Sequence, residues 1–270
     1  MKTLQNKVVW LTGASSGIGE ALAYVLSSKK CKLIISSRNG VELERVKRCC
    51  ENGGENIFVL PIDLTKTEEL PHTAKEALNH WGKIDCFIHN AGLAVRDLAV
   101  NTNEEIDREV METNYFGPML LTKCILPHML EKRSGHIVVI SSLSGKYGVP
   151  KLSAYAASKH ALHGFFDSLR TEAAGMQLKI SLIVPGFIKT PIANHTRDGK
   201  GNSYGKMIRA NEKGMSAECC AGKIMKAILS EKEETLIGGA EMFSVYLHRF
   251  FPRLFSSIIR NHPVRRLRFR

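Results

Sequence analysis

The chain of 270 residues has no long apolar run, and its first residues do not have the pattern expected of a signal peptide. Only Met1 to Asn6 precede the first apolar segment, and no uninterrupted apolar stretch reaches the ~18 residues of a membrane-spanning helix. Internal repeats and low-complexity blocks are also missing. Hydrophobic residues make up 44% of the chain, enough for a full core in one large or two small domains. We therefore expect a cytoplasmic protein without a spanning helix.

A Cys-x-x-Cys motif is also missing. The chain has 7 cysteines, an odd number, and they include the adjacent pairs Cys49-Cys50 and Cys219-Cys220. Adjacent cysteines suit neither a metal site nor an easy disulfide. We expect reduced, mostly buried thiols and no metal centre.

Acidic residues are scarce at the C-terminal end. The net charge is +12, and from Glu241 onward there are seven arginines and one acid, so this end holds six of the twelve charges. The pattern indicates a basic tail on a mildly basic domain, and it argues against a nucleic-acid-binding domain.

Apolar segments typical of buried strands alternate with helical segments. This order predicts an α/β fold with a doubly wound parallel sheet in three layers. The expected strands are 7–12, 31–36, 57–60, 84–88, 137–141, 178–184 and a short 235–237. The expected helices are 20–28, 41–51, 67–81, 104–114, 117–132 and 216–230. We place this domain in residues 1–240, followed by a helical extension over 241–270.

Ligands of such sheets lie at the carboxyl ends of the strands. Gly13, Arg38, Asp63, Asn90 and Ser142 each follow an expected strand. Their convergence at one edge is the main physical argument for a binding site there.

A glycine loop joins the first strand to the first helix. Its glycines, Gly13, Gly17 and Gly19, have the spacing Gly-x-x-x-Gly-x-Gly, which differs from the common Gly-x-Gly-x-x-Gly fingerprint. Backbone amides at the start of a helix can hold a pyrophosphate. The loop therefore indicates a dinucleotide site.

The second strand has no acid at its end. An acid there normally binds the ribose 2′-hydroxyl of NAD. Here the sequence is Ser36-Ser37-Arg38, and an arginine can pair with a 2′-phosphate. We therefore expect NADP(H) in preference to NAD(H). The alternative is that Arg38 belongs to an ordinary surface turn.

The stretch from Ser142 to Lys159 carries the predicted chemistry. Tyr155 and Lys159 are four residues apart in an alanine-rich helical segment, so they share one helix face. A nearby ammonium lowers the pKa of a phenol, which allows proton transfer near neutrality. Ser142 can bind a substrate oxygen on which charge develops. Tyr147 and Lys151 have the same spacing, but Gly148 and Pro150 favour a loop.

Three further segments leave alternatives open. Asn114 is expected in mid-helix, where its side chain either forms hydrogen bonds in the interior or caps a helix. Residues 192–215 have few structural signals and predict a substrate lid. The tail combines apolar residues at helical spacing with arginine. It contacts an anionic membrane, a second subunit or its own cleft, with nucleic acid the least favoured partner.

Together these motifs resemble the short-chain dehydrogenase/reductase family over residues 7 to about 238. The resemblance depends on the glycine loop, Asp63-Leu64, Asn90-Ala91-Gly92, Asn114, Ser142, Tyr155-x-x-x-Lys159 and Pro185-Gly186. His89 stands where the family usually has a first asparagine. The family implies a single Rossmann-type domain and hydride transfer between NAD(P)H and a carbonyl or alcohol.

The resemblance also implies roles for individual residues. Tyr155 would be the acid or base, Lys159 would lower its pKa and hold the nicotinamide ribose, Ser142 would orient the substrate, and Asn114 would hold a water of the proton relay. Cofactor contacts would come from Gly13, Ser15, Ser16, Gly17, Ile18, Gly19, Arg38, Asp63, Leu64, Asn90, Ala91, Gly92, Tyr155, Lys159, Pro185, Gly186, Ile188 and Thr190.

Segments 121–129 and 158–166 and the aromatic, basic tail look similar to the microsomal branch that includes 11-beta-hydroxysteroid dehydrogenase and the retinal and steroid reductases. That branch implies NADP(H), a lipophilic carbonyl or alcohol substrate and membrane contact. The chain shows no N-terminal anchor of that type, so we expect any peripheral membrane contact through the tail. The family also implies a homo-oligomer. The alternatives are a 3-oxoacyl thioester reductase and a non-catalytic, cofactor-binding regulatory subunit.

Overall fold

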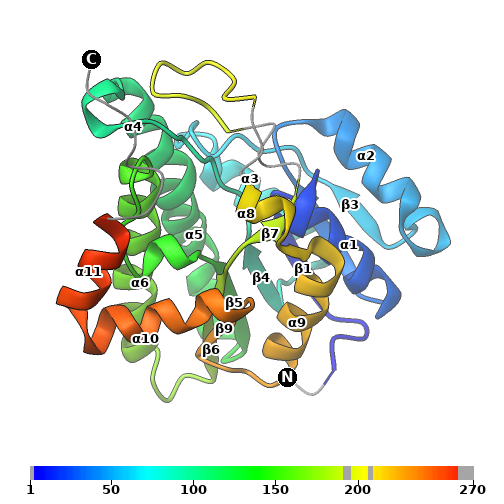
Figure 1. Cartoon of the computed structure of the whole chain (residues 1–270). Helices are drawn as coiled ribbons and strands as arrows, with labels where there is room; N and C mark the ends of the chain where they lie inside the picture. Colours follow the sequence, from blue (N-terminus) through cyan, green and yellow to red (C-terminus); the bar gives the residue numbers. More distant parts are fainter. Residues whose placement is uncertain (1–2, 191–195, 206–208, 261–270) are drawn as a thin grey trace.

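The computed structural model describes residues 3–190, 196–205 and 209–260. Its core is a seven-stranded parallel sheet in the order β3-β2-β1-β4-β5-β6-β9 (Figure 1). The strands are β1 Val8–Thr12, β2 Lys32–Ser36, β3 Ile57–Val59, β4 Cys86–His89, β5 Gly135–Ile140, β6 Leu178–Pro185 and β9 Glu234–Ile237. A separate parallel pair joins β7 (Ile188–Lys189) to β8 (Met215–Ser216).

Helices cover both faces of the sheet, so the expected three-layer α/β fold is confirmed. One face carries α1 (Gly17–Ser28), α2 (Gly40–Cys49) and α9 (Ala217–Leu229). The other carries α3 (Leu70–Trp81), α5 (Gly117–Glu131) and α6 (Ser153–Glu172). The remaining helices are α4 Glu104–Met111, α8 Arg209–Glu212, α10 Phe243–Phe250 and α11 Pro252–Arg260.

Strand residues alternate between the two faces. Val9 and Leu11 pack beneath α1 and α9, whereas Val8 and Trp10 pack on the opposite side with α3 and α5. The central strands are therefore apolar on both faces, as their continuous hydrophobic sequences predict. The strand order reverses between β1 and β4, and this reversal is the point at which ligands of such sheets bind.

Two predicted segments differ in detail from the structure. The helix expected over 104–114 ends as α4 at Met111, and Glu112–Phe116 form a π-helical turn before α5. The third helix begins at Leu70 and not at Thr67. Both differences are local, since helix boundaries depend on tertiary contacts that a single sequence does not contain.

The C-terminal extension folds back along the molecule. In Figure 1, α10 and α11 lie beside α6. Phe255 of α11 is buried with Leu143, Tyr147 and Val184, and Ile259 packs against this cluster. None of the helices within the described ranges is sufficiently long and apolar to cross a bilayer. All seven cysteines are free, and Cys49 and Cys219 are exposed.

Candidate active site

A cavity of ≈ 1120 Å³ lies at the carboxyl ends of the central strands. All but two of the predicted site residues line it, although they come from seven separate stretches of the chain. The exceptions are Gly19 and Asn114, which lie behind its wall. The predicted residues in the wall are Gly13, Ser15, Ser16, Gly17, Ile18, Arg38, Asp63, Leu64, Asn90, Ala91, Gly92, Ser142, Tyr155, Lys159, Pro185, Gly186, Ile188 and Thr190.

The glycine loop forms one end of this cavity. Gly13 and Gly17 have φ angles of +68° and +58°, a region that favours glycine. A Cβ on Gly19 would lie 2.0 Å from the carbonyl oxygen of Gly13, so Gly19 contributes close packing. Ser15 to Ile18 line the cavity at the start of α1, where backbone amides have no partner within the helix. This geometry suits a pyrophosphate.

Asn90 and Thr12 fasten the loop to the end of β4. The Asn90 Nδ2 donates to the carbonyl oxygens of Gly13 at 3.0 Å and Thr12 at 3.2 Å. The Thr12 hydroxyl accepts from the backbone amides of Asn90 at 3.2 Å and Ala91 at 3.3 Å. Thr12 is fully buried and was not predicted as a site residue. Its signal in the sequence was a lone polar residue at the end of an apolar strand.

Arg38 lies on the same side of the pocket as the glycine loop, because Thr12 and Ser36 pair at the ends of β1 and β2 and the Ala14 amide donates to the Ser36 carbonyl oxygen at 3.2 Å. Ser37 and Asn39 line the cavity beside it, and no acid follows β2. Burial acts to raise the pKa of the Asp63 carboxyl, but hydrogen bonds from Thr65 and the charge of Arg38 outweigh it and lower the pKa. Among the described residues, Arg38 has no ion-pair partner within 4.0 Å, so its guanidinium is available to an anion.

Tyr155, Lys159 and Ser142 meet where α6 passes the end of β5. The Lys159 Nζ lies 5.7 Å from the centroid of the Tyr155 ring and donates to the Ile140 carbonyl oxygen at 3.0 Å. Burial lowers the pKa of Lys159 to about 8. Burial also raises the pKa of Tyr155, and a hydrogen bond with Ser142 offsets only part of that rise. The expected lowering of the Tyr155 pKa by Lys159 is therefore wrong for this structure, because desolvation of the phenolate dominates.

Asn114 occupies the π-helical turn and is fully buried. Its Nδ2 donates to the Leu93 carbonyl oxygen and to the Ser158 Oγ, both at 2.9 Å. Its Oδ1 accepts from the Leu93 amide at 2.7 Å. Asn114 therefore forms hydrogen bonds in the interior and does not cap a helix. Gly92 lies between Asn114 and Lys159, since a Cβ there would be 3.3 Å from the Asn114 Oδ1 and 3.6 Å from the Lys159 Nζ.

The second Tyr-x-x-x-Lys pair is in a loop, as predicted. Tyr147 lies outside any helix, and Lys151 has a φ of +69°. The Tyr147 hydroxyl is 2.6 Å from the Ser244 Oγ, so this residue links the loop to α10.

The predicted lid, 192–215, has more structure than its sequence indicated. Arg197 pairs as an isolated bridge with Val95 and with Ser203, and its guanidinium contacts both carboxylate oxygens of Glu109 at 2.7 and 2.9 Å. Residues 192–195 and 206–208 of the segment lie outside the described residues. The described part of the segment contributes Thr196, Arg197, Gly201, Ser203 and Asn211 to the cavity wall.

The fold and the cavity together define a protein built to hold a dinucleotide beside a Ser-Tyr-Lys group. The family model described as short chain dehydrogenase matches residues 7–201. The chain belongs to the short-chain dehydrogenase/reductase family, and the expected family is confirmed. Family membership makes it an oxidoreductase with a nucleotide cofactor.

Two relatives and one solved structure illustrate the similarity. "Dehydrogenase/reductase SDR family protein 7-like" of Drosophila melanogaster is 38% identical over 97% of this chain and 82% of its own length. The human "Dehydrogenase/reductase SDR family member 7" is 40% identical over 92% and 75%. A short-chain dehydrogenase/reductase from Burkholderia phymatum in complex with NAD superposes with a TM-score of 0.84 at 25% identity, over 94% of this chain and 96% of that one.

Proposed function

We propose that this protein is an NADP(H)-dependent carbonyl reductase or alcohol dehydrogenase that acts on a lipophilic ketone, aldehyde or secondary alcohol. The observation that carries this proposal is that Ser142, Tyr155 and Lys159 line one cavity together with the glycine loop. Bound NADPH supplies the hydride for carbonyl reduction. The side chains supply binding, orientation and the proton.

The Tyr155 phenol gives its proton to the carbonyl oxygen in reduction and accepts one from the alcohol in oxidation. Ser142 binds the same oxygen and shares a hydrogen bond with Tyr155. Lys159 lies on the same face of α6 and holds the nicotinamide ribose. Because burial raises the pKa of Tyr155, the phenol stays protonated at neutral pH. A protonated phenol is the form that reduction requires.

The preference for NADP(H) is part of the proposal. It is supported by the available charge of Arg38, by the neighbouring hydroxyl of Ser37 and by the lack of an acid after β2. Glu42 also lines this end, and Arg45 pairs with its carboxylate at 2.7 Å and with that of Glu20 at 2.8 Å. Arg38 is therefore the cation that remains for a 2′-phosphate.

The lipophilic substrate is supported by an apolar group in the cavity wall that the sequence analysis did not assign to the site. Tyr147, Val149 and Leu152 come from the loop before α6, Phe187 follows β6, and Ile259 comes from α11. These residues come from three distant parts of the sequence, so their spacing could not predict that they line one cavity.

A 3-oxoacyl thioester reductase is the second candidate. Arg96 lines the cavity and has no ion-pair partner among the described residues, so it is available for an acidic carrier. The apolar wall favours a free lipophilic substrate over a carrier-bound one. The non-catalytic alternative has no support from the site, because all four proposed catalytic residues are present.

The test is replacement of Tyr155 by Phe, which removes the phenolic proton and leaves the ring. NADPH consumption should be measured with retinals, steroids, aromatic ketones and a 3-oxoacyl thioester. We expect turnover to fall at least ~100-fold, the scale of general acid catalysis, with NADPH binding nearly unchanged. Tyr246→Phe on the exposed face of α10 is the control. Full activity in Tyr155→Phe would refute the assignment.

We further propose that the domain of residues 1–240 carries the chemistry, that 192–215 act as its lid, and that 241–270 are a separate extension. A homo-oligomer is proposed on the family resemblance alone. The extension has an exposed apolar face made of Phe243, Tyr246, Phe250, Phe251, Leu254 and Ile258.

The exposed Arg249 and Arg253 adjoin this face, and the combination supports peripheral contact with an anionic membrane. The predicted tail residues Arg265, Arg266, Arg268 and Arg270 lie outside the described residues. Sedimentation with vesicles of neutral or anionic lipid tests the contact, with Phe250→Ser/Phe251→Ser as the variant. We expect binding to anionic vesicles that the variant loses. Concentration-dependent self-association without vesicle binding would instead assign the face to a second copy.

A further inference from the structure

A second polar cluster lies directly behind the proposed catalytic serine. His163 is on α6, about two turns beyond Tyr155. Its Nε2 is 2.9 Å from the Oγ of Ser141, the residue that precedes Ser142. Both side chains are buried, with exposed fractions of 8% for His163 and 4% for Ser141. The proposed reaction uses neither of them.

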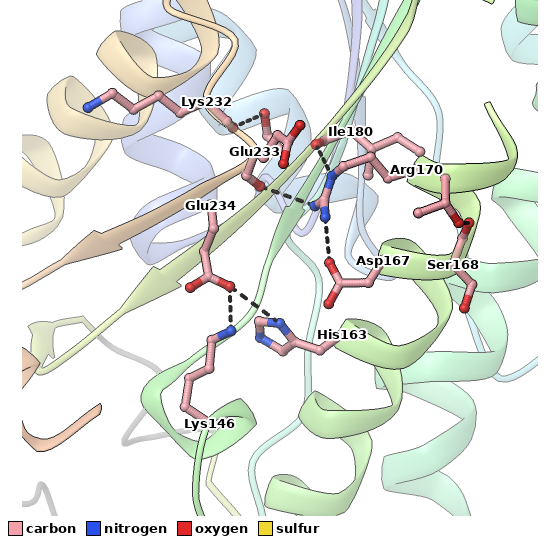
Figure 2. Close-up of polar contacts among 11 residues, drawn as sticks. Lys146, His163, Asp167, Ser168, Arg170, Ile180, Lys232, Glu233 and Glu234 are labelled. Atoms are coloured by element: carbon pink, nitrogen blue, oxygen red, sulfur yellow. Dashed lines mark hydrogen bonds and ion pairs between the residues drawn. The ribbon is translucent and has the colours of Figure 1, made fainter. Parts of the chain in front are cut away.

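The other end of the same segment is held from β9. Lys146 follows the short 3-10 turn Leu143–Gly145 and forms a hydrogen-bonded ion pair with Glu234 (Figure 2). The same Glu234 oxygen lies 3.9 Å from the Nδ1 of His163. At this distance Glu234 makes no hydrogen bond to His163, so the imidazole is held by the contact between its Nε2 and the Ser141 Oγ. Residues 141–146 are thus fastened at both ends.

The packing leaves this segment little room to move. A Cβ on Gly145 would lie 2.6 Å from the Ser141 Oγ and 3.0 Å from both the His163 Cδ2 and the Lys159 carbonyl oxygen. The backbone of the segment therefore rests directly on α6. Glycine at 145 allows the His163–Ser141 hydrogen bond to form.

The rest of α6 is also tied to the sheet. Lys159 donates to the Ile140 carbonyl oxygen, and Arg170 donates to the carbonyl oxygens of Ile180 at 3.1 Å and Glu233 at 3.2 Å (Figure 2). These hydrogen bonds fix the position of α6 along the strands β5 and β6 and next to the start of β9. Tyr155 is placed by the helix, whereas Ser142 is placed by its own segment. His163 is the side chain of α6 that bonds to a side chain of this segment, next to the bond from Lys159 to the Ile140 carbonyl oxygen.

We propose that His163 is a positioning residue, whose hydrogen bond to Ser141 sets the position of the Ser142 hydroxyl relative to the Tyr155 phenol. This inference rests on the proposed function, because it assumes that Ser142 and Tyr155 act on one substrate oxygen. A displacement of about 1 Å can cost up to ~100-fold in rate. His163 therefore affects turnover without touching the substrate or the cofactor.

The chain contains a matched control. The His136 Nε2 lies 2.8 Å from the Ser181 Oγ, so a buried His–Ser hydrogen bond also joins β5 to β6. The Ser181 hydroxyl donates to the Lys232 carbonyl oxygen at 2.6 Å, so His136 is the donor in this bond. Neither residue lines the cavity. Loss of either bond removes one buried His–Ser contact, but only the His163 bond holds the Ser142 segment.

The experiment compares glutamine and asparagine at each histidine. Glutamine can place its amide near the Nε2 position, whereas asparagine ends near Nδ1. We expect His163→Asn to lower kcat about tenfold or more with the KM for NADPH unchanged, and His163→Gln to recover most of kcat. His136→Asn should lower the unfolding midpoint by a similar amount and leave kcat within about twofold. Ser141→Ala should repeat the loss, and His163→Asn should add little to it.

Equal effects of the two asparagine variants on kcat would overturn the proposal, as would full activity in both His163→Asn and Ser141→Ala. If His163→Asn does not fold, Ser141→Ala alone decides, because it removes only a hydroxyl. Failure of the proposed function has a different signature, since Tyr155→Phe would then remain active. If Tyr155→Phe is inactive while the His163 and Ser141 variants work normally, only the positioning role is lost.

Discussion

At the adenosine end of the cavity, cofactor choice depends on Arg38 in our proposal. A charged hydrogen bond to a phosphate contributes about 1.5–3 kcal/mol, which corresponds to roughly 10- to 100-fold in affinity. We expect Arg38→Ala to weaken NADPH binding by this factor and to leave NADH binding nearly unchanged. Titration of the intrinsic fluorescence with each cofactor measures both affinities.

Arg48→Ala is the matched control for this prediction. Arg48 is exposed on α2, carries the same charge and does not line the cavity. It should change neither affinity beyond about twofold. Wild-type protein that binds NADH as tightly as NADPH would show that Arg38 is only a surface residue, and the proposed direction of reaction would then shift toward alcohol oxidation.

Residue types and spacing predicted most of the groups in the cavity wall but not their electrostatics. Tyr155 and Lys159 are on one face of α6, as four-residue spacing requires. The predicted direction of the Tyr155 pKa shift was wrong, because burial of the phenol raises its pKa by more than the hydrogen bond with Ser142 lowers it. Spacing reports neighbours along a helix and contains no information on the dielectric environment that tertiary packing creates.

At the scale of elements, α11 contributes Ile259 to the apolar part of the cavity wall, where we propose that the substrate binds. The ring of Phe255 lies 4.8 Å from that of Tyr147 and 5.0 Å from that of His248. Removal of a buried phenyl group costs about 3–5 kcal/mol. A helix of nine residues is not stable alone and depends on such packing to stay in place. We expect Phe255→Ala to release α11 and raise the substrate KM severalfold, with NADPH affinity unchanged.

Phe250→Ala removes the same ring from an exposed site on α10 and should leave KM unchanged. Steady-state kinetics with the best substrate of the screen provides the comparison. Equal KM values in the two variants would mean that α11 does not shape the substrate end.

Elements with a continuous pattern were predictable, and elements defined by side-chain contacts were not. The strands and α1, α2, α5 and α9 follow from apolar runs and helical periodicity. The π-helical turn at Asn114 was not predictable from the sequence. The Asn114 amide bonds to Leu93 and Ser158, which are distant in the chain, so no local pattern indicates the turn. The bridge of Arg197 to Val95 is likewise a long-range contact without a local signal.

For the whole molecule, the fold buries three histidines, His89 on β4, His136 on β5 and His163 on α6. Burial lowers the pKa of His89 to about 3, and those of His136 and His163 to about 4. In the unfolded chain these groups take up protons near pH 6.5. The folded pKa values are depressed, so the unfolded state binds more protons between pH 6.5 and about 4. The stability from these histidines is fully present above pH 6.5 and is lost as the pH falls through this window.

Denaturant unfolding at pH 7.0, 6.0 and 5.0 measures this loss. Each buried histidine contributes up to about 1.4 kcal/mol per pH unit to the decline in the free energy of unfolding. The carboxylates with lowered pKa values, such as Asp85, lose their stabilising charge only at lower pH, so they do not mask the effect.

His136→Gln keeps a polar group for Ser181 and removes one titrating site. Its unfolding should therefore take up about one proton fewer, and its free energy of unfolding should fall less steeply with pH. His72→Gln, at an exposed position on α3, should leave the slope as in wild type. A wild-type free energy that stays constant from pH 7 to 5 would contradict the burial of neutral histidines on which this argument depends.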